Sequence, residues 1–231
     1  MMNSHMPYYA PFTQGNDGLM LWLNLDPDYR TTSSGTATDW KNFMKTSEIF
    51  GNTNSARHPA DNGTHITFDG SDFLECNVDR DLDTDVSGWT IYMRTTEVDW
   101  SANSALAGDD NTNNMFIKNV GDRFSIKCYD GSSSSTKVIS FDDPTDLVDG
   151  QYYNLAVTCT TSGLTTAYID GVAQADTANF TNTFNMIFSE IGGKNGTGWM
   201  LDGNIQEVLV WPAPLTALQI ADVNTYLNNK F

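Results

Sequence analysis

The chain has 231 residues, a formal net charge of -17, 39% apolar residues and 12% aromatic residues. The negative field opposes binding to nucleic acid and to anionic lipid, which leaves neutral ligands and cations as the expected partners. No segment has the unbroken apolar length of a membrane span, whereas the apolar and aromatic content suffices for a folded core. We therefore expect one globular domain that neither binds nucleic acid nor inserts into a membrane.

The first residues are predicted to form an N-terminal arm over 1–16, followed by one domain over 17–231. The arm lacks the basic start and the apolar stretch of a secretory signal. A first strand is predicted from Leu19 to Leu25, where leucine occupies every second position. The polar segment from Asp26 to about Asn62 is predicted to be one long loop.

Strand patterns fill the middle of the chain. One face of a predicted strand consists of Trp89, Ile91 and Met93. The other face consists of Thr90, Tyr92 and Arg94, as in a strand with one buried face. Further strands are predicted near residues 64–74, 113–119, 123–129, 136–141, 151–160, 164–170, 187–192 and 203–211. Many short strands at this spacing indicate a sandwich or a barrel.

A helix is predicted only at the C-terminus. Thr216 can cap it, with Gln219 as the reciprocal partner three residues later, and Leu215 can pack on Ile220 as a hydrophobic staple. The apolar stripe of this helix consists of Ile220, Val223 and Leu227. A helix this short is marginal alone, so it is expected to dock on a sheet.

Three cysteines, Cys76, Cys128 and Cys159, each fall in phase with aliphatic neighbours on a strand face. An odd number in this pattern favours buried free thiols over a disulfide or a reactive thiol. Such usage is typical of a chain that folds in a reducing compartment.

The order of motifs in the last 80 or so residues is specific for a fold. The motifs are Tyr152–Thr158, Ala167–Gly171, Ile191–Gly193 and Leu201–Trp211, and they are preceded by Thr67–Leu74 and Gly88–Ile91. This succession resembles a laminin-G-like domain of the concanavalin A-like lectin and glucanase superfamily, from about residue 17 to 231. The resemblance implies an all-β fold: a two-sheet antiparallel jelly-roll sandwich with a short C-terminal helix.

Catalysis is not expected. Endoglucanases of this superfamily need carboxylates at alternate positions of one strand, and the segment Glu97–Ala102 lacks the last of them. The histidines His5, His58 and His65 lie in no nucleophile or zinc motif. The chain is therefore predicted not to be an enzyme, and a laminarinase-like glycoside hydrolase is the least favoured alternative.

Calcium is the candidate cofactor, because the resemblance implies it: laminin-G-like domains often carry calcium at the rim of the sandwich. The candidate oxygen ligands are Asp69, Asp72, Asp109 and Asp110. The default interpretation is that these residues are solvated turn aspartates, and calcium binding is the alternative.

Glycan binding is expected where aromatic rings and amide groups meet in loops, since sugar C–H groups pack on flat rings. The candidate ligand-binding residues are Trp100, Asn111, Tyr129, Asn195 and Trp199. Packing in the core is the competing role for the tryptophans, and Trp22, Trp89 and Trp211 are assigned to it.

These expectations together favour a surface protein of a virion, either a capsid decoration or a host-adhesion subunit that contacts glycans. The predicted location is the virion surface or the extracellular space, and the expected partners are glycans, other virion proteins or further copies of the chain. The main alternative is a free-standing carbohydrate-binding module or lectin of a secreted protein.

Overall fold

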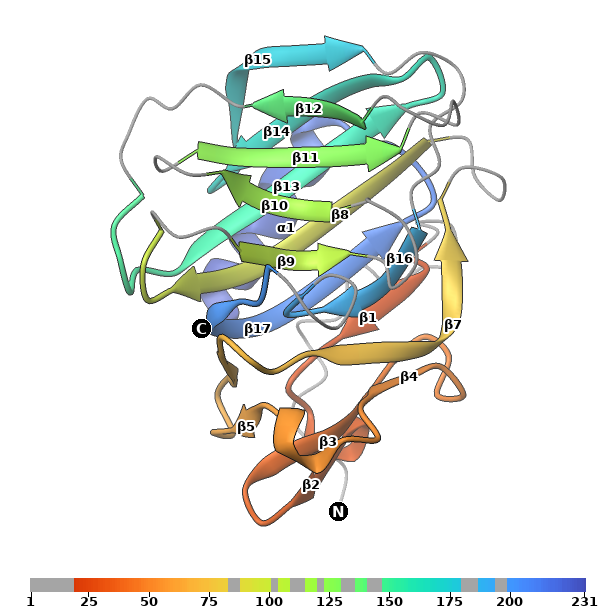
Figure 1. Cartoon of the computed structure of the whole chain (residues 1–231). Coiled ribbons are helices and arrows are strands. Elements are labelled where there is room, and N and C mark those ends of the chain that lie inside the picture. Colours follow the sequence, from red (N-terminus) through yellow and green to blue (C-terminus); the bar gives the residue numbers. More distant parts are fainter. Residues whose placement is uncertain are drawn as a thin grey trace.

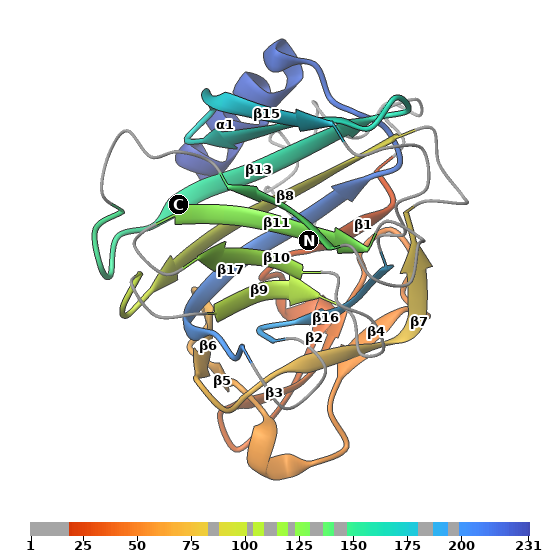
Figure 2. The same ribbon diagram turned by 45° about the horizontal axis from the view of Figure 1, so that its top comes forward.

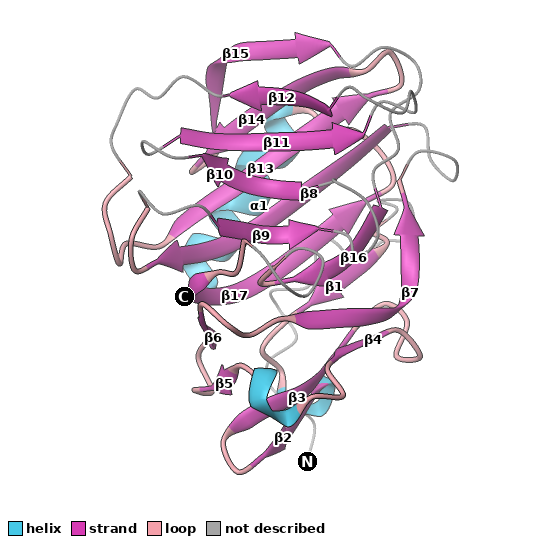
Figure 3. Ribbon diagram, in the orientation of Figure 1, coloured by secondary structure: helices cyan, strands magenta, loops and turns pink. Residues whose placement is uncertain are grey.

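Two antiparallel sheets lie face to face in a computed structural model of the chain, and one helix covers the outer side of one sheet (Figures 1 and 3). The structure describes residues 19–82, 88–100, 104–108, 115–119, 123–129, 136–140, 147–179, 187–193 and 199–231. Within these ranges no helix combines the length and the apolar character needed to cross a bilayer. The arm predicted over residues 1–16 lies outside them.

The back sheet is the layer beneath the helix. Its neighbouring strands are, in order, β1 (Leu21–Leu23), β17 (Asp202–Trp211), β8 (Gly88–Glu97), β13 (Tyr153–Thr160), β14 (Leu164–Ile169) and β15 (Val172–Asn179), and β6 (Ile66–Asp69) pairs with the other end of β17. The helix, α1 (Ala217–Lys230), runs on the side of this sheet that faces away from the other layer (Figures 1 and 2).

The front sheet is the second layer. Its strands, in order, are β4 (Ile49–Gly51), β7 (Leu74–Asp81), β16 (Ile187–Ile191), β9 (Ser104–Gly108), β10 (Met115–Asn119), β11 (Arg123–Tyr129) and β12 (Thr136–Ser140). All recorded strand pairings are antiparallel, so the predicted all-β antiparallel sandwich is confirmed.

The segment from Asp26 to Asn62 corrects the sequence-based prediction of a long loop. It contains η2 (Pro27–Tyr29), β2 (Arg30–Ser33), β3 (Thr36–Lys41), β4, η3 (Ser55–Arg57) and β5 (Ala60–Asp61). β2 and β3 form a hairpin around Ser34 and Gly35, both of which have positive φ values. Because these strands are short and polar, their pairing leaves only a weak periodic signal.

Alternate residues of β8 face two different cores. Trp89, Ile91 and Met93 are buried between the sheets. Tyr92 is buried beneath α1, together with Trp211 and other large side chains. A strand that looks half-exposed in the sequence is therefore covered on both faces, since the helix supplies the second cover.

The helix begins as predicted. The Thr216 side chain accepts a hydrogen bond from the Gln219 backbone N–H, and the Gln219 side chain accepts one from the Thr216 backbone N–H. Leu215 and Ile220 are both buried in the core beneath the helix. The caps satisfy N–H groups that the first helical turn leaves open.

Candidate functional site

Two segments meet where β6 ends and β17 begins. The backbone N–H of Gly70 donates to the carbonyl of Leu201 over 2.9 Å, and Asp69 lies opposite Asp202 in the strand pairing. We call the combination of residues 69–72 and 199–202 the Trp199 corner.

Trp199 presents an aromatic ring to solvent at this corner. Its side chain is large, yet the residue is 39% exposed and its backbone has a φ of 59°. The left-handed region is costly for a bulky residue, and such strain gathers at functional sites. The carbonyl of Trp199 accepts a hydrogen bond from the N–H of Ala105 in β9 over 2.7 Å, which ties the strained residue to the front sheet.

The base of the loop before Trp199 is closely packed. Gly192 donates its N–H to Leu106, and its carbonyl accepts from Leu201, each over 3.0 Å. The φ of Gly192 is 78°, and an added Cβ would lie 2.2 Å from the ring of Phe68. Only glycine fits at this position. The hydrogen bond from Leu201 to Gly192 joins the residues on either side of the loop, and the one from Gly192 to Leu106 ties them to β9.

An acidic pair is exposed at the Trp199 corner. Asp69 and Asp202 are both exposed and share one face of the β6–β17 pairing, whereas Phe68 and Leu201 are buried. The side-chain hydroxyl of Ser71 donates to Asp69 over 2.7 Å and lowers the pKa of Asp69, so this carboxylate stays ionised. Like charges at directly opposed positions are destabilising, so hydroxyl donors or a cation would be favourable here.

Asp72 is the buried carboxyl group of the same turn. It is 5% exposed and accepts a hydrogen bond from the backbone N–H of Asp69 over 3.3 Å. Burial raises the pKa of Asp72 to about 6, and the charge of Asp69 acts in the same direction. Of the four aspartates predicted as metal ligands, Asp69 and Asp72 therefore lie in different environments.

Trp100, another predicted ligand contact, lies in the core between the sheets. Its side chain is fully buried and packs edge-on against Tyr153, with ring centroids 5.7 Å apart. Its backbone N–H donates to Asp149 over 2.8 Å. In this position the ring offers no surface to a ligand approaching from solvent.

The other predicted site residues cannot be placed beside the corner. Asn111, Asn195, Asp109 and Asp110 lie outside the described residues, and Tyr129 ends β11 with an undescribed side chain. Among the described residues, no three His, Cys, Asp or Glu side chains gather as a metal site would require. The ligand contacts and the calcium site stay predictions.

Asp202 is the corner residue that the sequence reasoning missed. It stands between Leu201 and Gly203, which are both buried, and alternation alone would place it outward. Its partner Asp69 is 133 positions earlier in the chain, so only the β6–β17 pairing shows that two carboxylates meet.

Glu97, the residue considered for catalysis, ends β8 inside the protein. Its side chain is 1% exposed and accepts a hydrogen bond from the hydroxyl of Ser104. The buried cysteines Cys76 and Cys159 are free, as predicted, and the side chain of Cys128 lies outside the described residues.

The comparisons with known proteins define the class. A laminin G-like family described as the concanavalin A-like lectin/glucanases superfamily matches residues 68–221, about two thirds of the chain. The chain therefore belongs to this superfamily and has the fold of its lectins. No curated protein matches the chain significantly.

Several solved structures share the fold at low identity. A Trypanosoma rangeli sialidase has a TM-score of 0.62 and 14% identity over 94% of this chain and 33% of its own. Domain 4 of an extracellular GH43 arabinanase from Geobacillus stearothermophilus, in complex with arabinotriose, has a TM-score of 0.54 and 15% identity over 89% and 98%. The botulinum neurotoxin serotype G binding domain has a TM-score of 0.57 and 14% identity over 90% and 50%. The chain spans about a third of the length of the sialidases.

The sialidases correct the prediction that the chain is not an enzyme. Chains that are enzymes contain this fold, so the missing carboxylate in Glu97–Ala102 is no ground for excluding catalysis. At 14% identity the likeness shows the fold alone, and no active site is carried over from it.

Proposed function

We propose that the chain is a glycan-binding domain and that the Trp199 corner is its binding site. The observation that carries the proposal is the exposed Trp199, which stands three positions before Asp202 in the chain, together with the exposed Asp202 and Asp69, which lie opposite each other in the strand pairing. A sugar ring would pack its C–H face on the indole and donate hydroxyl protons to the carboxylates. The backbone of Trp199, with a φ of 59°, is tied to β9 by the hydrogen bond from Ala105, so it needs no ordering when a ligand binds.

The first test is binding of arabinotriose, the ligand of the arabinanase domain, followed by a glycan array. We expect Trp199→Ala to weaken the binding of each glycan found by at least about tenfold, or about 1.4 kcal/mol. Leu218→Ala is the matched control, because Leu218 is 73% exposed on α1. Unchanged affinity in Trp199→Ala would reject the corner as the site.

A stability measurement separates this loss from misfolding. Trp199→Gly also removes the ring, but glycine adopts a φ of 59° without strain. We expect this variant to lose glycan binding while it melts at or above the temperature of the wild type. Lower stability together with lost binding would show that Trp199 serves the fold.

We also propose that the domain acts on the surface of a virion, either as a decoration or in host adhesion. The free thiols of Cys76 and Cys159 support folding in a reducing compartment. Capsid and tail genes next to its gene, and co-sedimentation of the chain with capsids, are the expected observations. Neighbouring genes for secreted polysaccharide-degrading enzymes would favour a secreted carbohydrate-binding module instead.

A further inference from the structure

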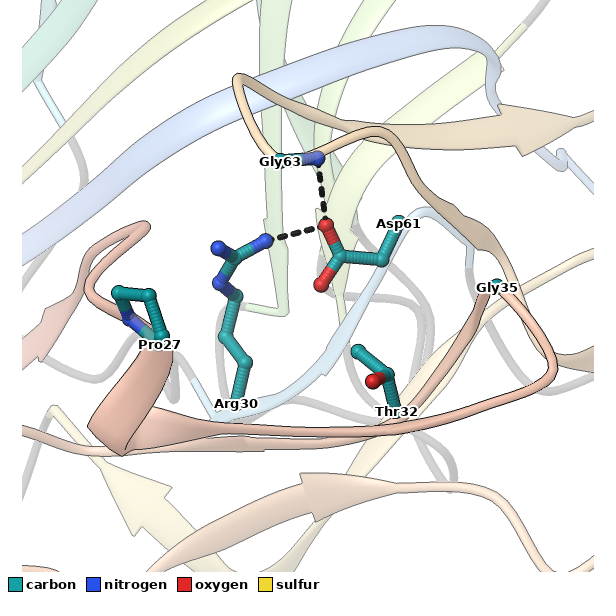
Figure 4. Close-up of a pocket in the computed structure, with 6 residues that line it drawn as sticks. All are labelled: Pro27, Arg30, Thr32, Gly35, Asp61 and Gly63. Carbon is teal, nitrogen blue, oxygen red and sulfur yellow. Dashed lines mark hydrogen bonds and ion pairs between the residues drawn. The ribbon is translucent and has the colours of Figure 1, made fainter.

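A polar pocket lies in the N-terminal part of the chain, outside the residues that match the superfamily. It has a volume of about 290 Å³ and lies between η2, the β2–β3 hairpin and the turn after β5 (Figure 4). Its lining residues are Pro27, Arg30, Thr32, Gly35, Asp61 and Gly63.

A buried ion pair forms one wall of the pocket. Arg30 Nη1 contacts Asp61 Oδ1, and the two side chains are only 6% and 5% exposed. The backbone N–H of Gly63 donates to the same Asp61 oxygen over 2.7 Å, which holds the carboxylate in place (Figure 4). Both charged groups are thus fixed by the fold.

The guanidinium of Arg30 is only partly used. Within the described part of the chain, Nη1 makes its single recorded interaction, and the buried Nε has no hydrogen-bond partner. The N–H groups of Nε and Nη2 form the side fork of an arginine, which matches two neighbouring acceptor oxygens. A buried donor without a partner lowers the stability of the fold, and a bound acceptor would relieve that cost.

The remaining groups define the chemistry of the occupant. Asp61 neutralises the charge of Arg30, and the whole chain carries a net charge of -17, so a second anion is disfavoured. Asp61 Oδ2 has no recorded partner among the described residues and can accept a proton donor, and the hydroxyl of Thr32 can donate or accept. An occupant that offers two adjacent oxygens and a hydroxyl proton would satisfy all three groups.

We propose that this pocket, the Arg30 pocket, binds one residue of a neutral glycan through two adjacent hydroxyl groups. The Arg30 fork donates to both hydroxyl oxygens, and Asp61 accepts one hydroxyl proton. The volume is at the low end of the ~300–1,000 Å³ that small-molecule pockets span, which suits a single sugar ring. The site is separate from the Trp199 corner and does not depend on it.

The test uses the full chain and the methyl glycosides of glucose, galactose, mannose and arabinose as probes. Binding is followed by NMR, with the side-chain Nε–H resonance of Arg30 as the reporter, assigned with Arg30→Lys. Thr32→Trp fills the pocket from an exposed position and leaves both residues of the ion pair unsubstituted, and Thr31→Trp, on the same strand but outside the pocket lining, is the matched control. We expect at least one probe to shift the Arg30 resonance, and its affinity to fall about tenfold or more in Thr32→Trp only.

Three results would overturn the proposal: no glycoside moves the Arg30 resonance, Thr32→Trp binds as well as Thr31→Trp, or methyl glucuronide binds more tightly than every neutral glycoside. The last result would assign the pocket to carboxylates. Trp199→Ala is expected to leave this resonance and its response unchanged, so failure of one site is distinguishable from failure of the other. Melting curves of both tryptophan variants should coincide, because both positions are exposed.

Discussion

Two arginines of this protein, the half-buried Arg94 and Arg30 with its buried side chain, have very different surroundings. Arg94, beneath α1, donates from Nε to Gln206 over 2.7 Å and from Nη1 to Asn154 and Asn228 over 3.0 and 3.2 Å. Its guanidinium also lies over an aromatic ring of Tyr152, 5.6 Å from the centroid. Arg30, in the N-terminal pocket, has one recorded ionic contact, and its Nε has no hydrogen-bond partner among the residues that the structure describes.

The difference assigns Arg94 a role in stability and Arg30 a role in binding. The hydrogen bonds of Arg94 join α1 to the back sheet and stabilise one arrangement of the two. The buried Nε of Arg30, which has no hydrogen-bond partner among the described residues, lowers stability without joining two elements. The helix interface should therefore respond to substitution in stability, and the Arg30 pocket in binding.

The largest effect is expected from Glu207→Ala. Glu207 is fully buried and accepts from Trp22 Nε1, Tyr226 Oη and Lys230 Nζ, so its removal takes an acceptor from three donors. Burial raises the pKa of Glu207, and Lys230 acts most strongly in the opposite direction. We expect urea denaturation to show a loss of about 3–5 kcal/mol. Asp222→Ala, on the exposed side of α1, is the control and should change stability by less than about 0.5 kcal/mol; equal effects would refute a structural network.

A medium effect is expected from Arg94→Met, which leaves several amide acceptors unpaired and should cost about 2–3 kcal/mol.

The double variant Arg30→Met with Asp61→Leu removes both charges of the pocket together. Because a buried ion pair gains little over apolar groups of similar size, the double variant should cost less than about 1.5 kcal/mol. The same denaturation series checks both values, and a more costly pocket variant would reverse our assignment of roles.

The smallest effect is expected from Asp72→Asn. The pKa of Asp72 is about 6 when folded, above its usual 3.8, so the folded state holds the proton more tightly and wild-type stability falls as pH rises from 4 to 6. Asparagine has no charge to desolvate, so the variant should be more stable than the wild type by about 1 kcal/mol at pH 8 and equal to it below pH 4.

Melting both proteins at pH 8 in EDTA and in calcium checks this prediction and the calcium prediction together. A gain in EDTA that persists in calcium would argue against Asp72 as a ligand, because a bound ion stabilises the folded state. A wild type that melts higher in calcium, while Asp72→Asn does not, would support the site.

The sequence by itself determined the fold class, the β8 and β17 strands and the helix cap, because these follow from local periodicity and from one hydrogen-bonding motif. It also identified Trp199 and Asp69 as candidates, since both stand at loops or turns.

Only the tertiary structure decided the sites. Trp100 and Trp199 have similar sequence surroundings, yet one ring is buried and the other is exposed, because the neighbouring strands cover one and not the other. Arg30 and Asp61 are 31 positions apart in a segment without clear periodicity, and the strands that join them carry little apolar signal. Strand pairing joins residues that are far apart in the sequence. The Asp69–Asp202 pair and the Arg30 pocket both depend on such pairing, so the sequence alone does not predict them.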